Sequence, residues 1–121
     1  QLCVASRPLA GDNWEKHCLP IHIEWDSHNY ICMAFDADGY IHLSANMHVD
    51  PLVYFISKSP YTITDWVEHK QLIGRDEDHC TYPAFLNTCD GKLVFHYRDG
   101  SSGDGCEIYN IYEHKNKTWK R

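Results

Sequence analysis

The chain has 121 residues, enough for one modest domain, and its 43% hydrophobic and 23% charged composition excludes an intrinsically disordered protein. Its formal net charge of −6 at pH 7 disfavours nucleic acid and anionic membranes as partners. No apolar run approaches the length of a membrane-spanning helix.

Alternating apolar and polar residues predict short β-strands separated by turns. The pairs Asp38-Gly39 and Asp90-Gly91 each lie between such segments and predict two β-hairpins. The segment 62–72 has poor helical periodicity, and we expect a loop there with at most one helical turn. The expected strands are 2–6, 21–25, 30–36, 40–46, 52–57, 85–86, 92–98, 107–112 and 118–120.

The two hairpins are related by a spacing of about 50 residues, which together with several strands per repeat is typical of β-propeller blades. We therefore expect an all-β fold in which residues 1–121 form a single partial β-propeller unit with blade-like repeats at about 26–60 and 80–115. This gives about two to two and a half blades, whereas closed propellers have roughly four to eight. The chain is expected to be an excised fragment, a subunit that completes a ring with other chains, or a filament protomer.

Six cysteines without a CxxC pair favour disulfides in an oxidising compartment over a zinc ribbon. Cys3–Cys18 and Cys80–Cys89 are plausible pairs, because each would close a short β connection. The sequon at Asn116 fits glycosylation. We expect a secreted, extracellular protein; no signal-peptide pattern begins at Gln1, as in a mature or excised chain.

Four polar side chains lie at expected strand ends or in loops, where propellers gather functional groups. They are His28, His48, Tyr82 and Arg98. Three of them also have a structural interpretation: a turn cap for His48, a packed loop aromatic for Tyr82, and an ion pair with Asp99 or Asp104 for Arg98.

The segments that carry these residues resemble the BNR-repeat polysaccharide lyases, a family that includes ulvan lyases and related rhamnosyl-glucuronate lyases. The resemblance runs from about Val4 to Trp119, and its most specific parts are Asn46-Met47-His48 and Tyr97-Arg98-Asp99-Gly100. Family members are typically much longer single-chain propellers, so this sequence corresponds to an internal portion. The matching segments are 25–30, 38–48, 51–55, 81–85 and 95–105.

The resemblance implies β-elimination at a uronic acid, with His28, His48, Tyr82 and Arg98 in the active site. Arg98 would face the substrate carboxylate, because the C5 proton becomes acidic only when that carboxylate is neutralised. Tyr82 would be the acid and a candidate base, and one histidine would share the proton transfer. The candidate substrate-binding residues are Asn29, Asn46 and Tyr97.

No cofactor and no metal are expected in catalysis, but a structural metal ion stays open because some related lyases carry one. His69 and His79, the latter next to Cys80, could bind zinc. Asp36 and Asp38 resemble part of a calcium loop, but no bidentate Glu follows at the right distance, so a turn is expected there.

We therefore expect a portion of a secreted lyase that acts on an acidic polysaccharide, without deciding whether the isolated chain is active. The alternative is a non-catalytic structural or glycan-binding propeller fragment that assembles with further blades or with copies of itself through open strand edges. A sialidase-like hydrolase is a weaker interpretation, because such enzymes place three arginines on one carboxylate. The arginines here are scattered along the chain: Arg7, Arg75, Arg98 and Arg121.

Overall fold

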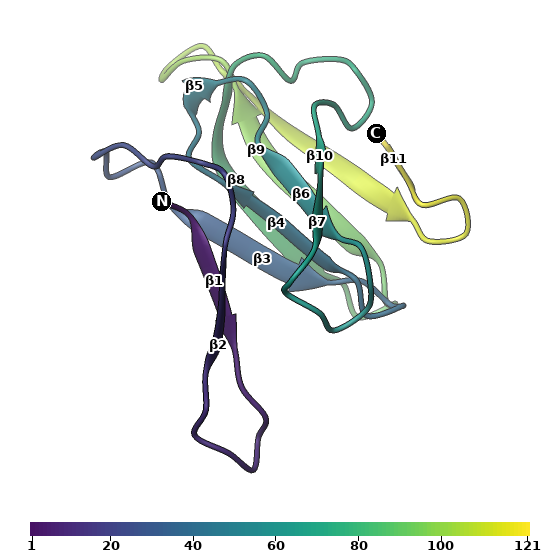
Figure 1. Cartoon of the computed structure of the whole chain (residues 1–121). Coiled ribbons are helices and arrows are strands. Elements are labelled where there is room, and N and C mark those ends of the chain that lie inside the picture. The colour runs from purple at the N-terminus through teal and green to yellow at the C-terminus, as the bar shows by residue number, and fades with distance from the viewer.

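The computed structural model describes every residue from Gln1 to Arg121 and confirms an all-β chain (Figure 1). No helix in it is long and apolar enough to cross a membrane. The strands are β1 (Cys3–Ser6), β2 (Glu15–Cys18), β3 (Ile31–Phe35), β4 (Ile41–Ala45), β5 (His48–Asp50), β6 (Tyr54–Ser57), β7 (Trp66–His69), β8 (Cys80–Asn87), β9 (Leu93–Asp99), β10 (Cys106–Glu113) and β11 (Thr118–Lys120).

The strands form one hairpin and two larger antiparallel sheets. β1 and β2 make the hairpin, β3-β4-β6-β7 make a four-stranded sheet, and β11-β10-β9-β8-β5 make a five-stranded sheet. Four neighbouring antiparallel strands in chain order form a propeller blade. The first sheet is such a blade, and β8 to β11 form a second one to which the short β5 adds at the edge. The inner strands β3 and β8 lie against each other, so the two blades are adjacent in a partial propeller (Figure 1). The finer division into repeats at 26–60 and 80–115 stays a prediction.

The two predicted hairpin turns are present. In the β3–β4 turn, Oδ1 of Asp36 accepts hydrogen bonds from the backbone N–H of Asp38 and of Tyr40, at 3.0 and 2.8 Å. Gly39 follows with a φ of 84°, where a Cβ would lie 2.4 Å from the Tyr61 ring. Gly91 has a φ of 81° in the β8–β9 turn. Both turns therefore use the conformational freedom that the Asp-Gly pairs indicated.

The main core lies between the two blades. Phe85 and Phe95 have ring centroids 4.6 Å apart, and Tyr54, Tyr97 and Trp119 pack around them. Burial of each large side chain contributes roughly 1.5–3 kcal/mol, so this interface is the main source of cohesion between the blades.

A second core lies between the N-terminal hairpin and the first blade. Leu2 and Leu19 are fully buried there against Leu43 and Phe55. The predicted disulfide Cys3–Cys18 is present and joins residues that are direct partners in the β1–β2 register. The far end of the hairpin projects away from the sheets in Figure 1.

Two local predictions are wrong. The segment 21–25 forms no strand; the partner of β1 is Glu15–Cys18, whose polar residues hid it from the hydrophobic pattern. The segment 62–72 contains strand β7, because Trp66 and Val67 pair with the edge of β6. A β-branched and an aromatic residue suit a strand better than a helical turn.

The predicted disulfide Cys80–Cys89 is also wrong. Cys80 is buried at the start of β8, and Cys89 is exposed in the turn after its end. An extended strand rises about 3.3 Å per residue, so roughly 20 Å or more separates the two, whereas bonded cysteines have Cα atoms within about 7 Å. Burial raises the pKa of the Cys80 thiol to about 12 and that of Cys32 to about 12.

One face of the inner strand β3 is an exposed apolar strip. Its side chains, Ile31, Met33 and Phe35, are 47%, 51% and 45% exposed. Alternation along a strand places these three residues on the same face, opposite the side packed against the second blade. Such a strip on a single chain is typical of a surface that another element covers.

Candidate functional site

The four predicted catalytic side chains come together at one end of the two inner strands; we call them the His–Tyr–Arg cluster. The imidazoles of His28 and His48 are stacked, with centroids 3.9 Å apart. The ring of Tyr82 lies 5.4 Å from that of His28, and Cζ of Arg98 lies 4.9 Å from the Tyr82 centroid. These residues come from the loop before β3 and from β5, β8 and β9, so four segments distant in sequence form one group.

Irregular backbone aims these side chains. The β8–β9 pairing shifts register between Thr81 and Ala84, and Tyr82 inside this bulge has a φ of 57°. Val49, next to His48, has a φ of 61°, and its N–H donates to Oγ1 of Thr81 at 2.7 Å. Bulges redirect side chains, and left-handed non-glycine residues cluster at functional sites. This local geometry is therefore consistent with a site rather than with a regular sheet edge.

Asp26 bridges the two histidines, and the sequence interpretation missed it. Its Oδ1 accepts from the backbone N–H of His28 at 2.7 Å and from Nδ1 of His28 at 2.6 Å, while Oδ2 accepts from Nδ1 of His48 at 2.9 Å. The backbone hydrogen bond from His28, followed by those from the two imidazoles, holds the pKa of the Asp26 carboxyl well below its ordinary value. The short spacing Asp26-Ser27-His28 was the only sequence signal for the first of these contacts.

The aspartate also sets the tautomer of both rings. An ionised carboxylate only accepts hydrogen bonds, so Nδ1 of His28 and of His48 carries the proton. In each neutral imidazole, Nε2 is then the nitrogen with a free lone pair. The pair is thus arranged to accept a proton on Nε2, with Asp26 stabilising the resulting cation.

The guanidinium of Arg98 is available to an anion. Its Nε donates to the carbonyl of Gly100 at 3.2 Å, whereas the ion pairs formed by arginines in this chain are Arg75–Asp76 and Arg121–Asp76. The alternative of a structural pair with Asp99 or Asp104 is therefore not what the structure shows. A Cβ on Gly105 would lie 2.9 Å from Cγ and Cδ of Arg98, so the turn 100–105 fits closely around this side chain.

The predicted substrate-binding residues lie outside this cluster, and for Asn29 and Asn46 the role stays a prediction. Asn29 and Asn46 line a neighbouring polar cavity of about 560 Å³, and the Oδ1 atom of each is buried without a hydrogen-bond partner. Tyr97 is fully buried in the core, and its hydroxyl donates to the carbonyl of Asp76 at 2.9 Å. Alternation along β9 turns Tyr97 away from the face that carries Arg98, so we correct this part of the prediction.

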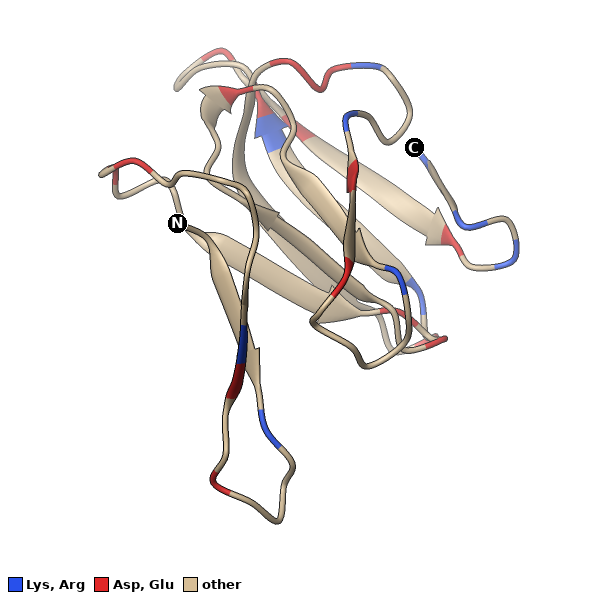
Figure 2. Ribbon diagram, in the orientation of Figure 1, with Lys and Arg blue, Asp and Glu red and all other residues tan.

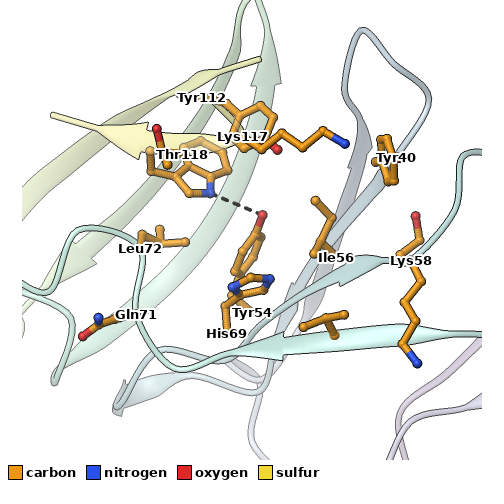
Figure 3. Close-up of a pocket in the computed structure, with 13 residues that line it drawn as sticks. Tyr40, Tyr54, Ile56, Lys58, His69, Gln71, Leu72, Tyr112, Lys117 and Thr118 are labelled. Atoms are coloured by element: carbon orange, nitrogen blue, oxygen red, sulfur yellow. Dashed lines mark hydrogen bonds between the residues drawn. The ribbon is translucent and has the colours of Figure 1, made fainter. Parts of the chain in front are cut away.

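A second cavity, of about 530 Å³, opens between the outer strands of the two blades (Figure 3). The Trp119 indole N–H donates to the Tyr54 hydroxyl at 3.3 Å there, a hydrogen bond that Figure 3 marks with a dashed line. None of the predicted site residues lines this cavity. Asn116, the predicted glycosylation site, is exposed in the neighbouring turn beside Lys117.

Two groups of side chains have the donor atoms for a metal ion. One is Asp26, His28 and His48, and the other is Asp36, Asp38 and His114. Neither contains His69 or His79, the pair considered from sequence. In the first group the hydrogen bonds join the candidate ligand side chains to one another, from both imidazoles to the Asp26 carboxylate, so a metal ion would have to displace them.

Charges around the cluster are mixed. Figure 2 shows charged residues mainly in loops and at strand ends, with the basic end of β9 among acidic segments. Arg98 is thus a local positive charge in a chain of net charge −6. The field of an exposed charge extends over a Debye length of about 8–10 Å before salt screens it. Arg98 can therefore attract an anion to the cluster.

Comparison with known proteins identifies relatives among polysaccharide lyases. A family model described as "BNR repeat-containing family member" matches residues 1–121. A long-isoform ulvan lyase of Glaciecola sp. (strain KUL10) is 37% identical over 41 residues, which cover 34% of this chain and 4% of that protein. A short-isoform ulvan lyase of Alteromonas sp. (strain LOR) is 39% identical over 41 residues, 34% of this chain and 8% of that protein.

Solved structures show the same fold. The crystal structure of polysaccharide lyase Uly1 aligns with a TM-score of 0.69 and 25% identity, over 78% of this chain and 28% of that one. A PL25 ulvan lyase bound to -[GlcA(1-4)Rha3S]- aligns with a TM-score of 0.66 and 19% identity, over 79% and 24%. The chain thus spans about a quarter of these solved chains and under a tenth of the curated relatives. Because the family model matches from the first residue to the last, the chain belongs to the BNR repeat-containing family, and its relatives are polysaccharide lyases.

Proposed function

We propose that this chain carries the catalytic groups of a secreted polysaccharide lyase that cleaves a uronic-acid-containing glycan by β-elimination. The observation that carries the proposal is the convergence of two imidazoles, a phenol and an unpaired guanidinium in one surface cluster. Such a cluster contains every type of group that this reaction needs.

In the proposed reaction, Arg98 binds the uronate carboxylate and stabilises the charge that develops on it when the C5–H bond breaks. A base takes the C5 proton, and the electron pair forms the C4–C5 double bond. The C4–O glycosidic bond then breaks, and an acid protonates the leaving oxygen. The products are an unsaturated uronate and a new chain end, with no net gain or loss of atoms.

The geometry supports particular roles for the other groups. Tyr82 lies close to both the histidine pair and Arg98. Its hydroxyl is therefore suited to act as the acid that protonates the leaving glycosidic oxygen. The free Nε2 atoms of His28 and His48 are suited to accept or relay the proton. Asp26 is a positioning residue that acts through both rings.

The substrate we propose is an acidic polysaccharide. A solved neighbour with the same fold is bound to a fragment that contains glucuronate, which supports this substrate class. The unpaired Arg98 provides the local attraction that a uronate needs, although the chain as a whole is acidic.

Further propeller blades, or copies of this chain, are the proposed protein partners. The apolar strip of Ile31, Met33 and Phe35 lies on an inner strand, where a closed propeller would bury it. Secretion is supported by the Cys3–Cys18 disulfide, which forms and persists in oxidising compartments.

The alternative function is a non-catalytic structural or glycan-binding fragment. The exposed strip favours it, since a chain that leaves an inner strand uncovered is suited to association. A native-mass measurement combined with activity and glycan-binding assays separates the two cases. A monomer that cleaves the glycan supports the first function, and an inactive assembly that still binds glycan supports the second.

The direct test is an activity assay on uronate-containing polysaccharide, with the unsaturated product followed by its ultraviolet absorbance. Tyr82→Phe and Arg98→Ala are each expected to abolish product formation while leaving the circular dichroism spectrum unchanged. Tyr109→Phe and Arg75→Ala, at exposed positions outside the cluster, are the matched controls and should keep activity. Product formation by Tyr82→Phe or Arg98→Ala at the wild-type rate would refute the assignment.

A further inference from the structure

The second metal-ligand group lies where the two blades meet, apart from the His–Tyr–Arg cluster. Asp36 and Asp38 belong to the β3–β4 turn of the first blade, and His114 follows β10 of the second blade. One ligand atom from each residue lies within 4.8 Å of the other two. Three potential ligands from two separate blades are thus close enough to share one ion.

His114 contributes to this group an imidazole that no other protein group engages by a hydrogen bond. Both of its ring nitrogens, Nδ1 and Nε2, are buried and have no hydrogen-bond partner. Buried polar atoms in native proteins almost always have a partner, and an unpaired one is costly. An imidazole held beside two carboxylates without a hydrogen bond to either is the geometry expected when a cation completes the set.

Asp36 is held rigidly for such a role. Its Oδ1 accepts two backbone N–H groups of its own turn, and its Oδ2 accepts from Nε2 of His42 at 3.4 Å. His42 in turn accepts at Nδ1 from the hydroxyl of Tyr54 at 2.6 Å. Hydrogen bonds of this kind behind a ligand fix its orientation and are typical of metal sites.

Asp38 differs from Asp36 because its side chain is exposed. The group therefore combines one buried carboxylate, one imidazole with buried nitrogens and one carboxylate at the surface. Solvent can reach an ion on the Asp38 side and supply a water ligand.

We propose that Asp36, Asp38 and His114 bind one Zn²⁺ ion that links the two blades. Two carboxylate oxygens and one imidazole nitrogen are ligands that zinc accepts, and a water in the fourth position completes its preferred tetrahedron. The histidine disfavours calcium and magnesium, which take oxygen ligands. The role is structural and does not depend on the proposed lyase activity.

The test is calorimetric titration of ZnCl₂ into chelator-stripped protein, with the wild type compared against Asp38→Asn and His114→Gln. Zinc affinity should fall at least tenfold in each variant, and zinc should raise the melting temperature of the wild type by several degrees but not that of the variants. The control is Asp26→Asn, which alters the other Asp–His group and should leave this affinity unchanged.

Asp38→Asn is the decisive variant, because an exposed turn residue can be changed without loss of the fold. The proposal is overturned if the wild type gives no zinc-binding heat, if Asp38→Asn binds zinc as tightly as the wild type, or if the affinity is lost only in Asp26→Asn. Tighter binding of CaCl₂ than of ZnCl₂ would also overturn the choice of ion.

Discussion

The chain contains two Asp–His arrangements that share their chemistry and differ in their surroundings. At the surface, Asp26 bridges His28 and His48, and the His48 side chain is 37% exposed. In the core, Asp36 meets His42, whose side chain is fully buried between the blades. The same pair of residue types thus occurs once with imidazoles that a sugar can reach and once with an imidazole buried in the core.

Burial makes the core pair a structural element. Removal from water lowers the pKa of the His42 imidazole to about 4, so the ring is neutral at pH 7. A continuous chain of donors then satisfies every member: Trp119 donates to Tyr54, Tyr54 to His42, and His42 to Asp36. A histidine next to an aspartate is therefore a candidate for catalysis only when its second nitrogen faces solvent.

The largest expected difference between the two arrangements is in stability. His42→Ala would leave a cavity and remove one hydrogen-bond partner each from Asp36 and Tyr54, so the free energy of unfolding should fall by about 3 kcal/mol or more. His48→Ala, at an exposed position, should change it by less than about 0.5 kcal/mol. Urea denaturation of both variants measures this contrast, and equal losses of stability in the two variants would contradict it.

Acid should destabilise the chain through the core histidine. The unfolded imidazole has a pKa of about 6.5, and the folded one about 4, so between these pH values the unfolded chain binds more protons. The stabilisation is therefore complete above about pH 6.5 and is lost as pH falls toward 4, by about 3 kcal/mol in all. Denaturation in the presence of chelator from pH 7 to 4 tests this, and a flat stability profile would contradict it. The control variant His48→Gln should show the same dependence of the free energy of unfolding on pH as the wild type.

Asp26→Asn should affect activity rather than stability. An amide cannot accept from both imidazoles, so at least one ring would lose its orientation, and kcat should fall by about 10²-fold. KM should stay nearly constant because Arg98, which we assign to the carboxylate, is untouched. Steady-state kinetics separate the two constants, with Asp104→Asn as the control. A rise in KM alone would assign Asp26 to binding instead of positioning.

A smaller effect is expected from Gly105→Ala. The added Cβ would lie 2.8 Å from the carbonyl oxygen of Ser101 and 2.9 Å from Arg98, so either the turn or the guanidinium must move. We expect KM to rise by about tenfold, the scale of one weakened charge-assisted hydrogen bond. Gly103→Ala, with no atom within 4 Å of its Cβ but a φ of 93°, controls for strain in the turn alone.

The sequence predicted the fold class because the strands and turns depend on local signals. Asp38-Gly39 and Asp90-Gly91 mark turns that only a few residue types can form, and the strands beside them alternate. The four residues of the His–Tyr–Arg cluster were found through a resemblance whose motifs surround them. These residues come together because the two blades pack against each other.

The elements and site residues that the sequence did not predict depend on contacts between segments far apart in the chain. β2 is polar because it lies on a projecting hairpin, and β5 has only three residues, so neither has a hydrophobic pattern. Asp26 became recognisable only when β5 brought His48 to it from 22 residues away. Tyr97 was misassigned because its neighbour Arg98 faces the cluster, while strand alternation turns Tyr97 into the core.

We propose that His28, His48, Tyr82 and Arg98 act together on one bound sugar carboxylate. NMR titration of this 14.1 kDa chain with a uronate-containing oligosaccharide tests it most directly. The imidazole signals of His28 and His48 and the Nε–H signal of Arg98 should shift along a single binding curve, while those of His42 stay in place. Binding that shifts signals at Tyr40 and Lys117, in the cavity between the outer strands, and leaves the two surface histidines unchanged would contradict the account.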